Sequence, residues 1–427
     1  MVLLKGKIGG RKSPPNSHLA TMKPLIVLLA ISLFTKQSYG QCDFKSPTEV
    51  LNLIRSNHPQ LSLNASTKEM LEKNINVANQ RPNPEMDLEA NSGDTSEGNK
   101  VTASIALKHV FELGNKRGAR VNLAQKEYQA KVAGIEVGDE DVVIETIIDL
   151  YRLRQISESI PLYEEALQAF NKILKTKRKR NALSPEEEVE KETLELATND
   201  YRLKLSQLMS EKINLNRHIS LFAGVNCEIP IKALPSKVNF NESFSLKEID
   251  AKYSKLLAAK KELEFAKASS RYEDSVAYPD LKVGPTYEYE ADNTNKSHTI
   301  GIALTMDLPI LNRNRAGKSM AAKRILVAQK NYKNIKSESK YDLESWISKY
   351  NRYKSSLRTI ANKADLERKH QKIEKLFNRG IISTSLVIES HRQLLEFTST
   401  RYEFELGAVE ALWNIYKLKG EINNKNI

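Results

Sequence analysis

The sequence predicts a mainly α-helical protein with a small β part, in which very long helices follow short amphipathic strands. Three observations lead to this class. Two stretches of about 60 residues keep a helical spacing of apolar side chains. Each of them begins just after a strand in which apolar and polar residues alternate. The whole succession occurs twice along the chain, which predicts an internal duplication.

The clearest strand pattern lies at Thr299–Asp307. One set of alternate positions is apolar, namely Ile300, Ile302, Leu304, Met306 and Leu308. The other set is small or polar, namely Thr299, Gly301, Ala303, Thr305 and Asp307. Alternation with period two predicts a strand with one apolar and one polar face. The small residues on the polar face indicate a lumen rather than a packed core.

Residues 1–40 predict an export signal. Met22 and Lys23 begin a charged segment, Leu25–Phe34 is an apolar run of ten residues, and Ser38–Gly40 is a small-x-small cleavage site. The apolar run is too short for the ~20 residues that cross a bilayer as a helix. The first 21 residues have no signal character, which makes Met22 an alternative translation start. We expect residues 1–40 to be removed during export.

The formal net charge of +13 overstates the charge of the mature chain. Six basic residues and no acidic ones lie in residues 1–40, so the mature chain carries +7. This mild excess does not indicate a nucleic-acid partner, which an exported protein rarely meets. The basic run Lys175–Arg180 therefore predicts a solvated face or a protein contact. Beyond the signal no apolar run could span a bilayer as a helix, so a membrane role would require strands.

Two cysteines follow the predicted cleavage site, Cys42 and Cys227, and exported proteins occupy compartments where disulfides persist. We favour a bond between them, which would close a loop of 185 residues. One alternative makes Cys42 a lipidated N-terminus, although Gln41 is not the small residue that usually precedes a lipidated cysteine. The other alternative is a pair of free thiols.

Residues 41–223 form the first predicted copy, and residues 224–243, with Pro230 and Pro235, form a linker. The expected elements of the first copy are a short helix with Val50, Leu51, Leu53 and Ile54, a helix at Ser66–Asn79, a strand at Glu85–Ala90, a polar loop at Asn91–Lys100, a strand from Val101 to Lys108, a helix from about Ala119 to Arg180, a turn at Asn181–Pro185 and a helix to about Leu221. Arg81–Pro84 stops the second helix, and Pro161 is a position where the long helix can bend.

Residues 244–427 form the second predicted copy. Its expected elements are a helix at Leu246–Tyr272, a strand at Leu281–Glu290, a polar loop at Ala291–His298, the strand described above, a helix at Ala316–Asn378, a turn at Arg379–Ser383 and a helix at Leu386–Lys419. Matching features are 195 to 199 residues apart, as Pro84 is from Pro279 and Ser184 from Ser383. The helix Ala316–Asn378 would be roughly 95 Å long.

The sequence contains no strong signal for catalysis, a cofactor or a metal. It has no phosphate-binding Walker loop, HExxH pattern or Ser/Cys nucleophile motif. Its histidines are scattered, and none pairs at metal-ligand spacing with another or with a cysteine: His18, His58, His109, His218, His298, His370 and His391. We therefore predict that the protein is not an enzyme and has no cofactor or metal site.

Two strand-to-helix junctions carry a resemblance to a known family. These are Glu112–Arg117 (ELGNKR) and Leu308–Arg315 (LPILNRNR), and the turn Arg379–Ser383 with Glu389 adds a third similarity. With the duplicated plan, they resemble the TolC family of outer-membrane efflux channels over about residues 42–420. The junctions are similar to those of the heavy-metal branch, the CzcC- and CusC-like proteins.

The resemblance implies a homotrimer with a twelve-stranded outer-membrane β-barrel, four strands from each chain, that continues into a long periplasmic α-helical coiled-coil barrel. Four strands are too few to close a barrel, whereas twelve is an even number within the known range. The implied function is a passive conduit in the outer membrane of a Gram-negative bacterium. Its implied partners are outer-membrane lipid, a periplasmic adaptor (membrane fusion) protein and an inner-membrane pump of the resistance-nodulation-division type.

The resemblance to the heavy-metal branch favours metal cations as the cargo, with small organic molecules and exported proteins as alternatives. A channel for type I protein secretion and a structural coiled-coil envelope protein without a pore are the alternatives. The four amphipathic strands argue against the second alternative, because a coiled coil has no use for them.

The resemblance also implies roles at the periplasmic ends of the helices. The expected adaptor contacts lie in the two turns: Asn181, Leu183, Ser184, Gly380, Ile381 and Ser383. The first turn departs from the family in having Asn181 where glycine is usual. The expected pore gate is a ring of carboxylates from Glu187, Glu190 and Glu389. The alternative is that these glutamates are ordinary solvated helix residues.

Overall fold

The computed structural model describes residues 42–95, 98–244, 252–360 and 363–427. These described residues belong to one compact unit, residues 41–427. Residues 1–40, which contain the predicted signal, lie outside the described residues. Within the described ranges, no helix is both long enough and apolar enough to cross a bilayer.

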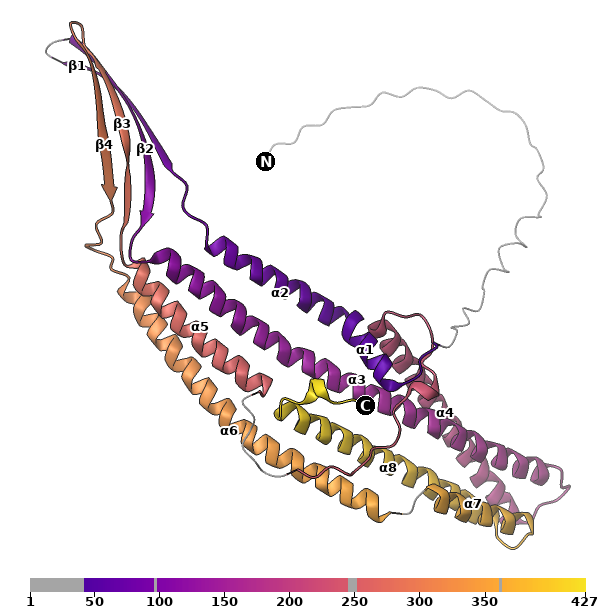
Figure 1. Cartoon of the computed structure of the whole chain (residues 1–427). Helices are drawn as coiled ribbons and strands as arrows, with labels where there is room; N and C mark the ends of the chain where they lie inside the picture. The colour runs from indigo at the N-terminus through magenta and orange to yellow at the C-terminus, as the bar shows by residue number, and fades with distance from the viewer. Residues whose placement is uncertain (1–41, 96–97, 245–251, 361–362) are drawn as a thin grey trace, which may run out of the picture. The chain divides into compact units, whose positions relative to one another are not determined.

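Eight α-helices, four strands and two short 3₁₀ helices make up the described part of the chain (Figure 1). The helices are α1 (Pro47–Asn57), α2 (Pro59–Ala78), α3 (Lys116–Arg178), α4 (Pro185–Ala223), α5 (Ser254–Val276), α6 (Arg315–Thr359), α7 (Lys363–Asn378) and α8 (Thr384–Leu418). The strands are β1 (Glu85–Thr95), β2 (Gly98–Glu112), β3 (Asp280–Ala291) and β4 (Lys296–Met306). The 3₁₀ helices are η1 (Ile231–Ala233) and η2 (Ile422–Asn424). The predicted class, mainly α with a small β part, is confirmed.

The strands form one antiparallel sheet in the order β1-β2-β3-β4. The predicted polar loop Asn91–Lys100 is wrong, because β1 and β2 stay paired from Asn91 and Thr102 up to Thr95 and Gly98. Polar side chains do not prevent this pairing, since the backbone groups still satisfy each other across the ladder. The second pair is likewise longer than predicted and turns at residues 292–295.

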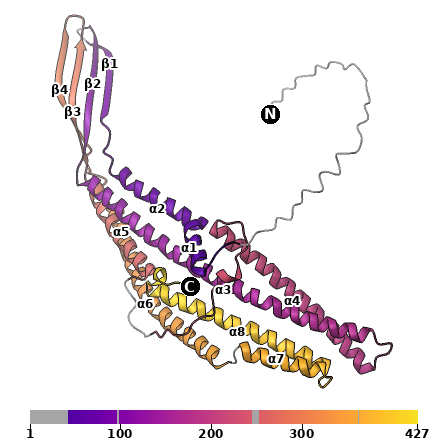
Figure 2. The ribbon, with the colours of Figure 1, turned by 45° about the vertical axis from the view of Figure 1, so that its right-hand side comes forward.

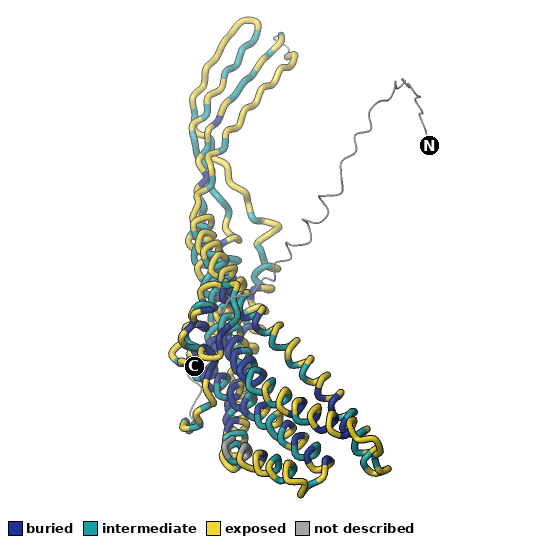
Figure 3. The backbone as a smooth tube through the Cα atoms, turned by 90° about the vertical axis from the view of Figure 1, so that its right-hand side faces the viewer, coloured by how far each residue is buried: buried dark blue, intermediate teal, exposed yellow. Residues whose placement is uncertain are grey.

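The helices pack as long neighbouring rods that carry the buried core. Helix α3 contacts α2, α4, α5 and α8, while α6 contacts α5 and α8. Phe170, Leu194 and Leu395 belong to one buried cluster that joins α3, α4 and α8. Tyr350 and Ile415 belong to another that joins α6 and α8. Figure 3 shows that buried residues concentrate in the helices, whereas the sheet is mostly exposed or half-buried.

Helix α3 runs for 63 residues and contains Pro161 without ending there. The predicted counterpart in the second half, a single helix over Ala316–Asn378, is wrong. Helix α6 ends at Thr359, and α7 begins at Lys363. Between them Ile360 has an extended backbone, with φ −85° and ψ 154°.

The interruption follows from local chemistry and from a tertiary contact. The Thr359 hydroxyl donates to the carbonyls of Ser355 and Ser356, and such side-chain bonds compete with helix continuation. The basic side chains in the last turns of α6 bind backbone carbonyls outside the helix. Lys354 Nζ lies 2.6 Å from the Glu242 carbonyl oxygen, and Arg358 Nη2 lies 2.8 Å from that of Phe240. The segment before α5 therefore holds the end of α6.

The predicted linker, residues 224–243, packs onto both halves of the chain. Ile229, Ala233 and Leu234 are buried in a cluster with Val50 and Leu150. Further along, Phe240 packs against the ring of Tyr350 in α6. Cys227 in this segment is disulfide-bonded to Cys42, with Cα atoms 5.2 Å apart.

Two predicted helix starts differ from the structure. Helix α2 begins at Pro59, seven residues before the predicted Ser66, because proline suits the first helical position and the His58 Nδ1 atom accepts from the Gln60 amide. Helix α5 begins at Ser254, and the predicted start at Leu246 lies outside the described residues.

A buried ionic network joins α3 to α8. The guanidinium of Arg154 pairs with the carboxylate of Glu405, and both side chains are buried. Gln155 Nε2 donates to the Tyr402 carbonyl at 3.0 Å and to Glu405 at 3.3 Å. The Val238 amide of the linker donates to the other Glu405 oxygen at 3.3 Å. One carboxylate thus ties together two helices and the linker.

Candidate functional site

The sheet has one continuous apolar face. Residues paired across an antiparallel ladder share a face, so the observed register defines its members. They include Met86, Leu88, Ile105, Leu107, Phe111, Leu281, Val283, Tyr287, Ile300, Ile302, Leu304 and Met306. On β4 the side chains of Ile300, Ile302 and Leu304 are 83%, 79% and 68% exposed. A large exposed apolar face of this kind indicates contact with lipid or with another protein.

The opposite face of the sheet carries polar and small side chains. It carries ion pairs between neighbouring strands: Lys282 Nζ lies 2.7 Å from Glu85, Lys100 Nζ lies 2.6 Å from Glu290, and Lys108 pairs with Asp87. Thr305, Ala303 and Gly301 of β4 lie on this face. The predicted division of β4 into an apolar and a polar face is therefore confirmed, and it extends over all four strands.

A glycine brings two strands close together on the polar face. A Cβ atom on Gly284 of β3 would lie 1.8 Å from the Leu107 carbonyl oxygen of β2, so no other residue fits there. The absence of a side chain at Gly284 also leaves space for a lysine side chain to pass across β3. Lys108 Nζ donates to the hydroxyl of Thr305 on β4 at 3.1 Å, which links β2 to β4 across β3. Gly284 therefore allows β3 to lie close to β2 and allows a side chain of β2 to hydrogen-bond to β4 across the polar face.

The two junctions between strand and long helix share one geometry. Asn115 before α3 and Asn314 before α6 both adopt left-handed conformations, with φ 57° and φ 53°. A Cβ atom on Gly118, or on Gly317, would lie 2.3 Å from the Oδ1 atom of the asparagine three residues earlier. Each asparagine side chain therefore folds over the first turn of its helix where glycine leaves space. This Asn-x-x-Gly pattern is a local signal that reasoning from the sequence missed.

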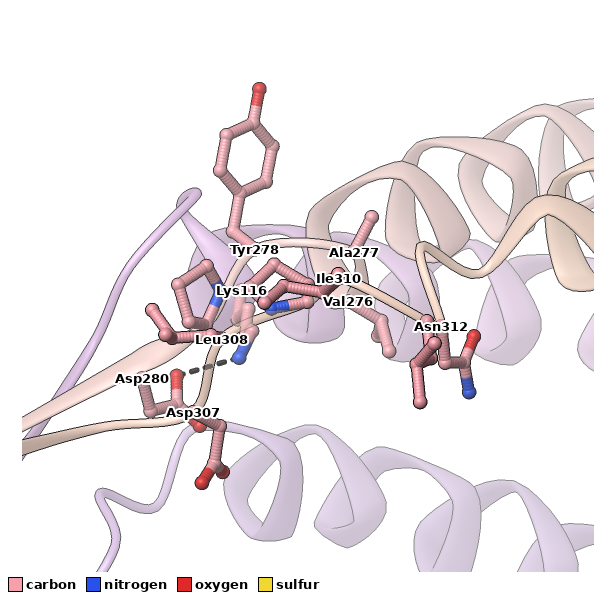
Figure 4. Close-up of a pocket in the computed structure, with 12 residues that line it drawn as sticks. Lys116, Val276, Ala277, Tyr278, Asp280, Asp307, Leu308, Ile310 and Asn312 are labelled. Carbon is pink, nitrogen blue, oxygen red and sulfur yellow. Dashed lines mark hydrogen bonds and ion pairs between the residues drawn. The ribbon is translucent and has the colours of Figure 1, made fainter.

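The second junction borders a cavity of about 750 Å³ (Figure 4). Lys116 and Asp280 form an ion pair of 2.6 Å beside it, drawn as the dashed line in Figure 4. The remaining lining is largely apolar and includes Val276, Leu308 and Ile310. The side chains of Leu308 and Ile310 are exposed, and Leu311 is fully exposed. This loop is thus an apolar surface at the level where the sheet meets the helices.

The helical hairpins α3–α4 and α7–α8 place their turns beside each other. A cavity of about 610 Å³ is lined by Lys177, Arg180 and Glu187 from the first hairpin and by Phe377, Gly380 and Val387 from the second. Both hairpins lie at the end of the helical part away from the sheet (Figure 2). The predicted turn residues therefore gather in one region.

The turn before α4 begins a well-capped helix. The Ser184 hydroxyl accepts from the Glu187 amide at 3.2 Å, and the Glu187 carboxylate accepts from the Ser184 amide at 3.1 Å. Asn181 does not adopt a left-handed conformation, so its difference from the family glycine causes no backbone strain. Asn181 and Ser184 are exposed, while Leu183 is half-buried.

The turn before α8 depends on glycine. Gly380 has φ 70°, and the Ile381 amide donates back to the Leu376 carbonyl at 3.0 Å, which closes the end of α7. The Ser383 hydroxyl then accepts from the Leu386 amide at 3.4 Å and caps α8. Ile381 is 62% exposed and Ser383 is exposed. Each turn thus presents exposed polar residues beside one apolar side chain.

All three predicted gate glutamates have basic partners in the structure. Glu190 pairs with Lys177 of α3 at 2.7 Å, and Glu187 pairs with Arg180. Glu389 pairs with Arg392 one turn later on α8 at 2.7 Å. The hydrogen bonds from Arg392 and then Gln393 lower the pKa of Glu389 to about 2. These partners, which the sequence reasoning missed, reduce the net charge at each position.

One group of side chains outside the predicted sites has metal-ligating chemistry. His370 and Glu374 of α7 and His391 of α8 place one ligand atom each within 4.8 Å of the others. Reasoning from the sequence missed this group because it compared histidines along the chain rather than across the α7–α8 turn. The two histidines lie ten positions before and eleven positions after Gly380, and that symmetry about the turn was the available signal.

Comparison with known proteins identifies the fold. No protein-family model and no curated protein sequence matches the chain. Among solved structures, the outer-membrane channel OprN is similar with a TM-score of 0.70 and 12% identity, over 90% of this chain and 93% of that one. The open state of the Neisseria gonorrhoeae MtrE outer membrane channel gives 0.66 and 12%, over 88% and 90%. CusC, described as forming a transmembrane channel, gives 0.63 and 13%, over 89% and 93%.

Proposed function

We propose that the chain is one subunit of a trimeric outer-membrane channel of the TolC type. In this role it is a passive conduit rather than an enzyme. It receives substrate from an inner-membrane pump through a periplasmic adaptor and carries it across the outer membrane of a Gram-negative bacterium. The observation that carries the proposal is the four-stranded sheet, with an exposed apolar face for lipid and a small, charged face for a water-filled lumen.

The edges of the sheet support assembly. Within the described part of the chain, strands β1 and β4 each have a partner on one side only. A long unpaired edge is a template for pairing with another chain. Pairing β4 of one copy with β1 of the next closes a ring, and three copies supply twelve strands, an even number that barrels of this kind use.

The repeated junction supports an internal duplication, with repeats at residues 41–223 and 244–427. Asn115 and Asn314 are 199 residues apart and share both their conformation and their relation to a following glycine. In the trimer, the paired long helices of both repeats would continue the barrel as a twelve-helix tube in the periplasm.

The tips supply the finer assignments. The exposed turn residues Asn181, Ser184, Gly380, Ile381 and Ser383, with the half-buried Leu183, are the adaptor contacts in this proposal. The glutamates Glu187, Glu190 and Glu389 form the gate, with their basic partners moderating its charge. Both assignments rest on the position of these residues at the far end of the helices.

The proposed cargo is heavy-metal cations, delivered by a pump of the resistance-nodulation-division type. The similarity of both junction sequences to CusC-like proteins and the structural likeness to CusC support this assignment. In this architecture the pump selects the cargo. The proteins encoded beside this one would therefore identify the cargo independently of any property of the channel.

The channel proposal is tested by purification followed by conductance measurement. The exported protein should fractionate with the outer membrane, require detergent for extraction and have the mass of three chains in native mass spectrometry. Reconstituted in a planar bilayer, it should produce discrete conductance steps, and a periplasmic adaptor protein should bind to it. Extraction without detergent as a monomeric rod, with no conductance, would establish the structural coiled-coil alternative instead.

A further inference from the structure

The α7–α8 hairpin contains two buried imidazoles that face each other. The rings of His370 and His391 are 4.5 Å apart between centroids and nearly perpendicular. The two residues are only 7% and 2% exposed. Their separation follows from the turn at Gly380, because antiparallel helices bring residues that are equally distant from the turn to the same level.

Both imidazoles have an unused nitrogen. The Nε2 atoms of His370 and His391 are buried and lack a hydrogen-bond partner among the described residues. His370 Nε2 lies 3.5 Å from Oε1 of Glu165 on α3 and 3.9 Å from Oε1 of Glu374, contacts without hydrogen-bond geometry. Buried polar atoms of this kind are rare and usually have a ligand, a water or a catalytic role.

We propose that His370, Glu374 and His391 form a binding site for one divalent transition-metal ion of the zinc class. Glu374 lies four residues after His370 and therefore on the same side of α7. The ligand atoms of the three residues lie within 4.8 Å of one another. Bound to a tetrahedral ion at 2.0–2.1 Å, such atoms are roughly 3.3 Å apart, so the ligand atoms approach one another by up to about 1.5 Å on binding.

The donor set determines the class of metal. Two imidazoles with a carboxylate suit Zn²⁺, Co²⁺ and Ni²⁺, whereas Mg²⁺ and Ca²⁺ prefer an all-oxygen set. Glu165 is a candidate fourth ligand from a third helix, because its carboxylate lies beside the same His370 nitrogen. An ion held in this way would crosslink α3, α7 and α8.

A cavity borders the site and offers a path for an ion. It has a volume of about 290 Å³ and is lined by His370 and Glu165 together with Glu158 and Tyr402.

The competing explanation is aromatic packing without a metal. His391 contacts the ring of Phe170 edge-on at 5.3 Å, and His370 contacts His391 in the same manner. Packing accounts for the burial of the two rings. It does not account for the unpaired Nε2 atoms or for the carboxylates of Glu374 and Glu165 beside one of them.

The test is metal titration of the purified full chain, stripped with a chelator and carrying no histidine tag. Co²⁺ is the probe, because tetrahedral coordination produces visible absorption bands, and Zn²⁺ should displace it. We expect one Co²⁺ per chain and no competition from Mg²⁺. The Glu374→Gln variant should weaken binding on the order of tenfold or more, and His370→Gln or His391→Gln should abolish the visible bands.

The matched control is His218→Gln. His218 also lies on a helix beside a carboxylate, at 3.2 Å from Asp149, but no third ligand group is recorded there among the described residues. This variant should bind Co²⁺ like the parent chain.

Glu374 is partly exposed, so Glu374→Gln decides the matter even if the buried histidine variants fail to fold. Absence of saturable binding, or equal binding by Glu374→Gln and His218→Gln, would overturn the proposal. The site requires only the hairpin and α3, so it stands or falls independently of channel activity.

Discussion

Arg392 holds the carboxylate of Glu389 at two points, with Nη2 2.7 Å from Oε1 and Nε 2.8 Å from Oε2. Gln393 adds a third hydrogen bond to Oε1 at 2.7 Å. These bonds favour the ionised carboxylate, and they lower the pKa of Glu389 to about 2. The proposed gate is therefore a ring of paired rather than bare charges.

This pairing defines a test of the gate by single-channel recording. Glu389→Gln should weaken cation selectivity and block by divalent cations, because a ring of like charge in a narrow mouth attracts cations. Adding Glu190→Gln should enlarge both effects, since it removes the second proposed ring. Unchanged selectivity and block in the double variant would leave these glutamates as surface charge and place the gate elsewhere.

Arg392→Gln is the informative companion to that test. The folded-state pKa of Glu389 is depressed below its ordinary 4.5, so the ion pair stabilises the tip above pH 4.5 and loses this effect as the pH falls through about 2. The parent channel should thus show no titration of Glu389 between pH 4 and 8. Removing Arg392 should raise cation selectivity at neutral pH and move a titration toward pH 4.5. A variant with the selectivity and pH profile of the parent would show that the pair lies away from the permeation path.

The two faces of β4 should differ in their tolerance of charge. Ile302 lies on the apolar face, where a cationic residue costs about 2–4 kcal/mol near the middle of a bilayer. Ala303 lies on the polar face beside Gly284 and should accept aspartate with little loss. We expect Ile302→Arg to reduce the amount of trimer in the outer membrane and Ala303→Asp to leave it unchanged. Equal amounts of both variants would contradict the assignment of the faces.

The Cys42–Cys227 bond should be present in the exported protein. In the chain-entropy model a loop of this length contributes roughly 4–5 kcal/mol. Mass spectrometry of the non-reduced protein should find the two cysteines in one crosslinked peptide pair. The Cys42→Ser/Cys227→Ser variant should then unfold at a lower temperature. An acylated Cys42, or two thiols that react with an alkylating agent, would contradict the bond.

Glu405 should be essential for stability. Removing one partner of a buried ion pair leaves an uncompensated charge, which typically costs about 3–5 kcal/mol. We expect Glu405→Gln to lower the free energy of unfolding substantially, measured by thermal or chemical denaturation followed by circular dichroism. The exposed pair of Arg178 and Glu195 provides the control, because solvent screens such a pair and Glu195→Gln should leave stability nearly unchanged. Similar effects of the two variants would show that the buried network contributes little.

Alanine substitution should have opposite effects on stability at a junction glycine and at an ordinary helix glycine. Gly317→Ala places a Cβ atom 2.3 Å from Asn314 Oδ1 and 2.4 Å from Glu273 Oε2, so Asn314 must leave its position over the helix. Gly138→Ala in α3 meets nothing within 4 Å and should stabilise the protein by about 0.5–1 kcal/mol, since alanine is the better helix former. Opposite signs of the two changes in melting temperature are expected. A gain in stability for Gly317→Ala would show that the Asn314 conformation is unimportant.

The repeated strands and helices could be predicted from the sequence because their periods are local. Alternation at Ile300, Ile302 and Leu304 identified an apolar face that the observed register then extended over four strands. The end of α6 could not be predicted in this way, since it depends on Lys354 and Arg358 binding carbonyls 112 and 118 residues away in the sequence. Helical periodicity carries no information on contacts of that range.

The candidate site residues also divide into those that local sequence predicts and those that depend on long-range contacts. The turn residues at Gly380 and Ser184 were recognisable from the internal repeat, which pairs Ser184 with Ser383 in the second turn. The pairing of Glu190 with Lys177 and the approach of His370 to His391 require the register between two helices of a hairpin. That register depends on how the turn closes, which the spacing of residues along one helix does not specify.

The bond between Cys42 and Cys227 also determines how the molecule is connected. It makes the chain into a covalent ring with a tail: α1 to α4, β1 and β2 lie within the ring, and β3, β4 and the later helices belong to the tail. A protease that cuts once at the α3–α4 turn would therefore leave a single covalent molecule, which separates into two fragments only after reduction. Ring and tail meet in the sheet where β2 pairs with β3. Hydrogen bonds and packing, without a covalent link, hold the tail against the ring there.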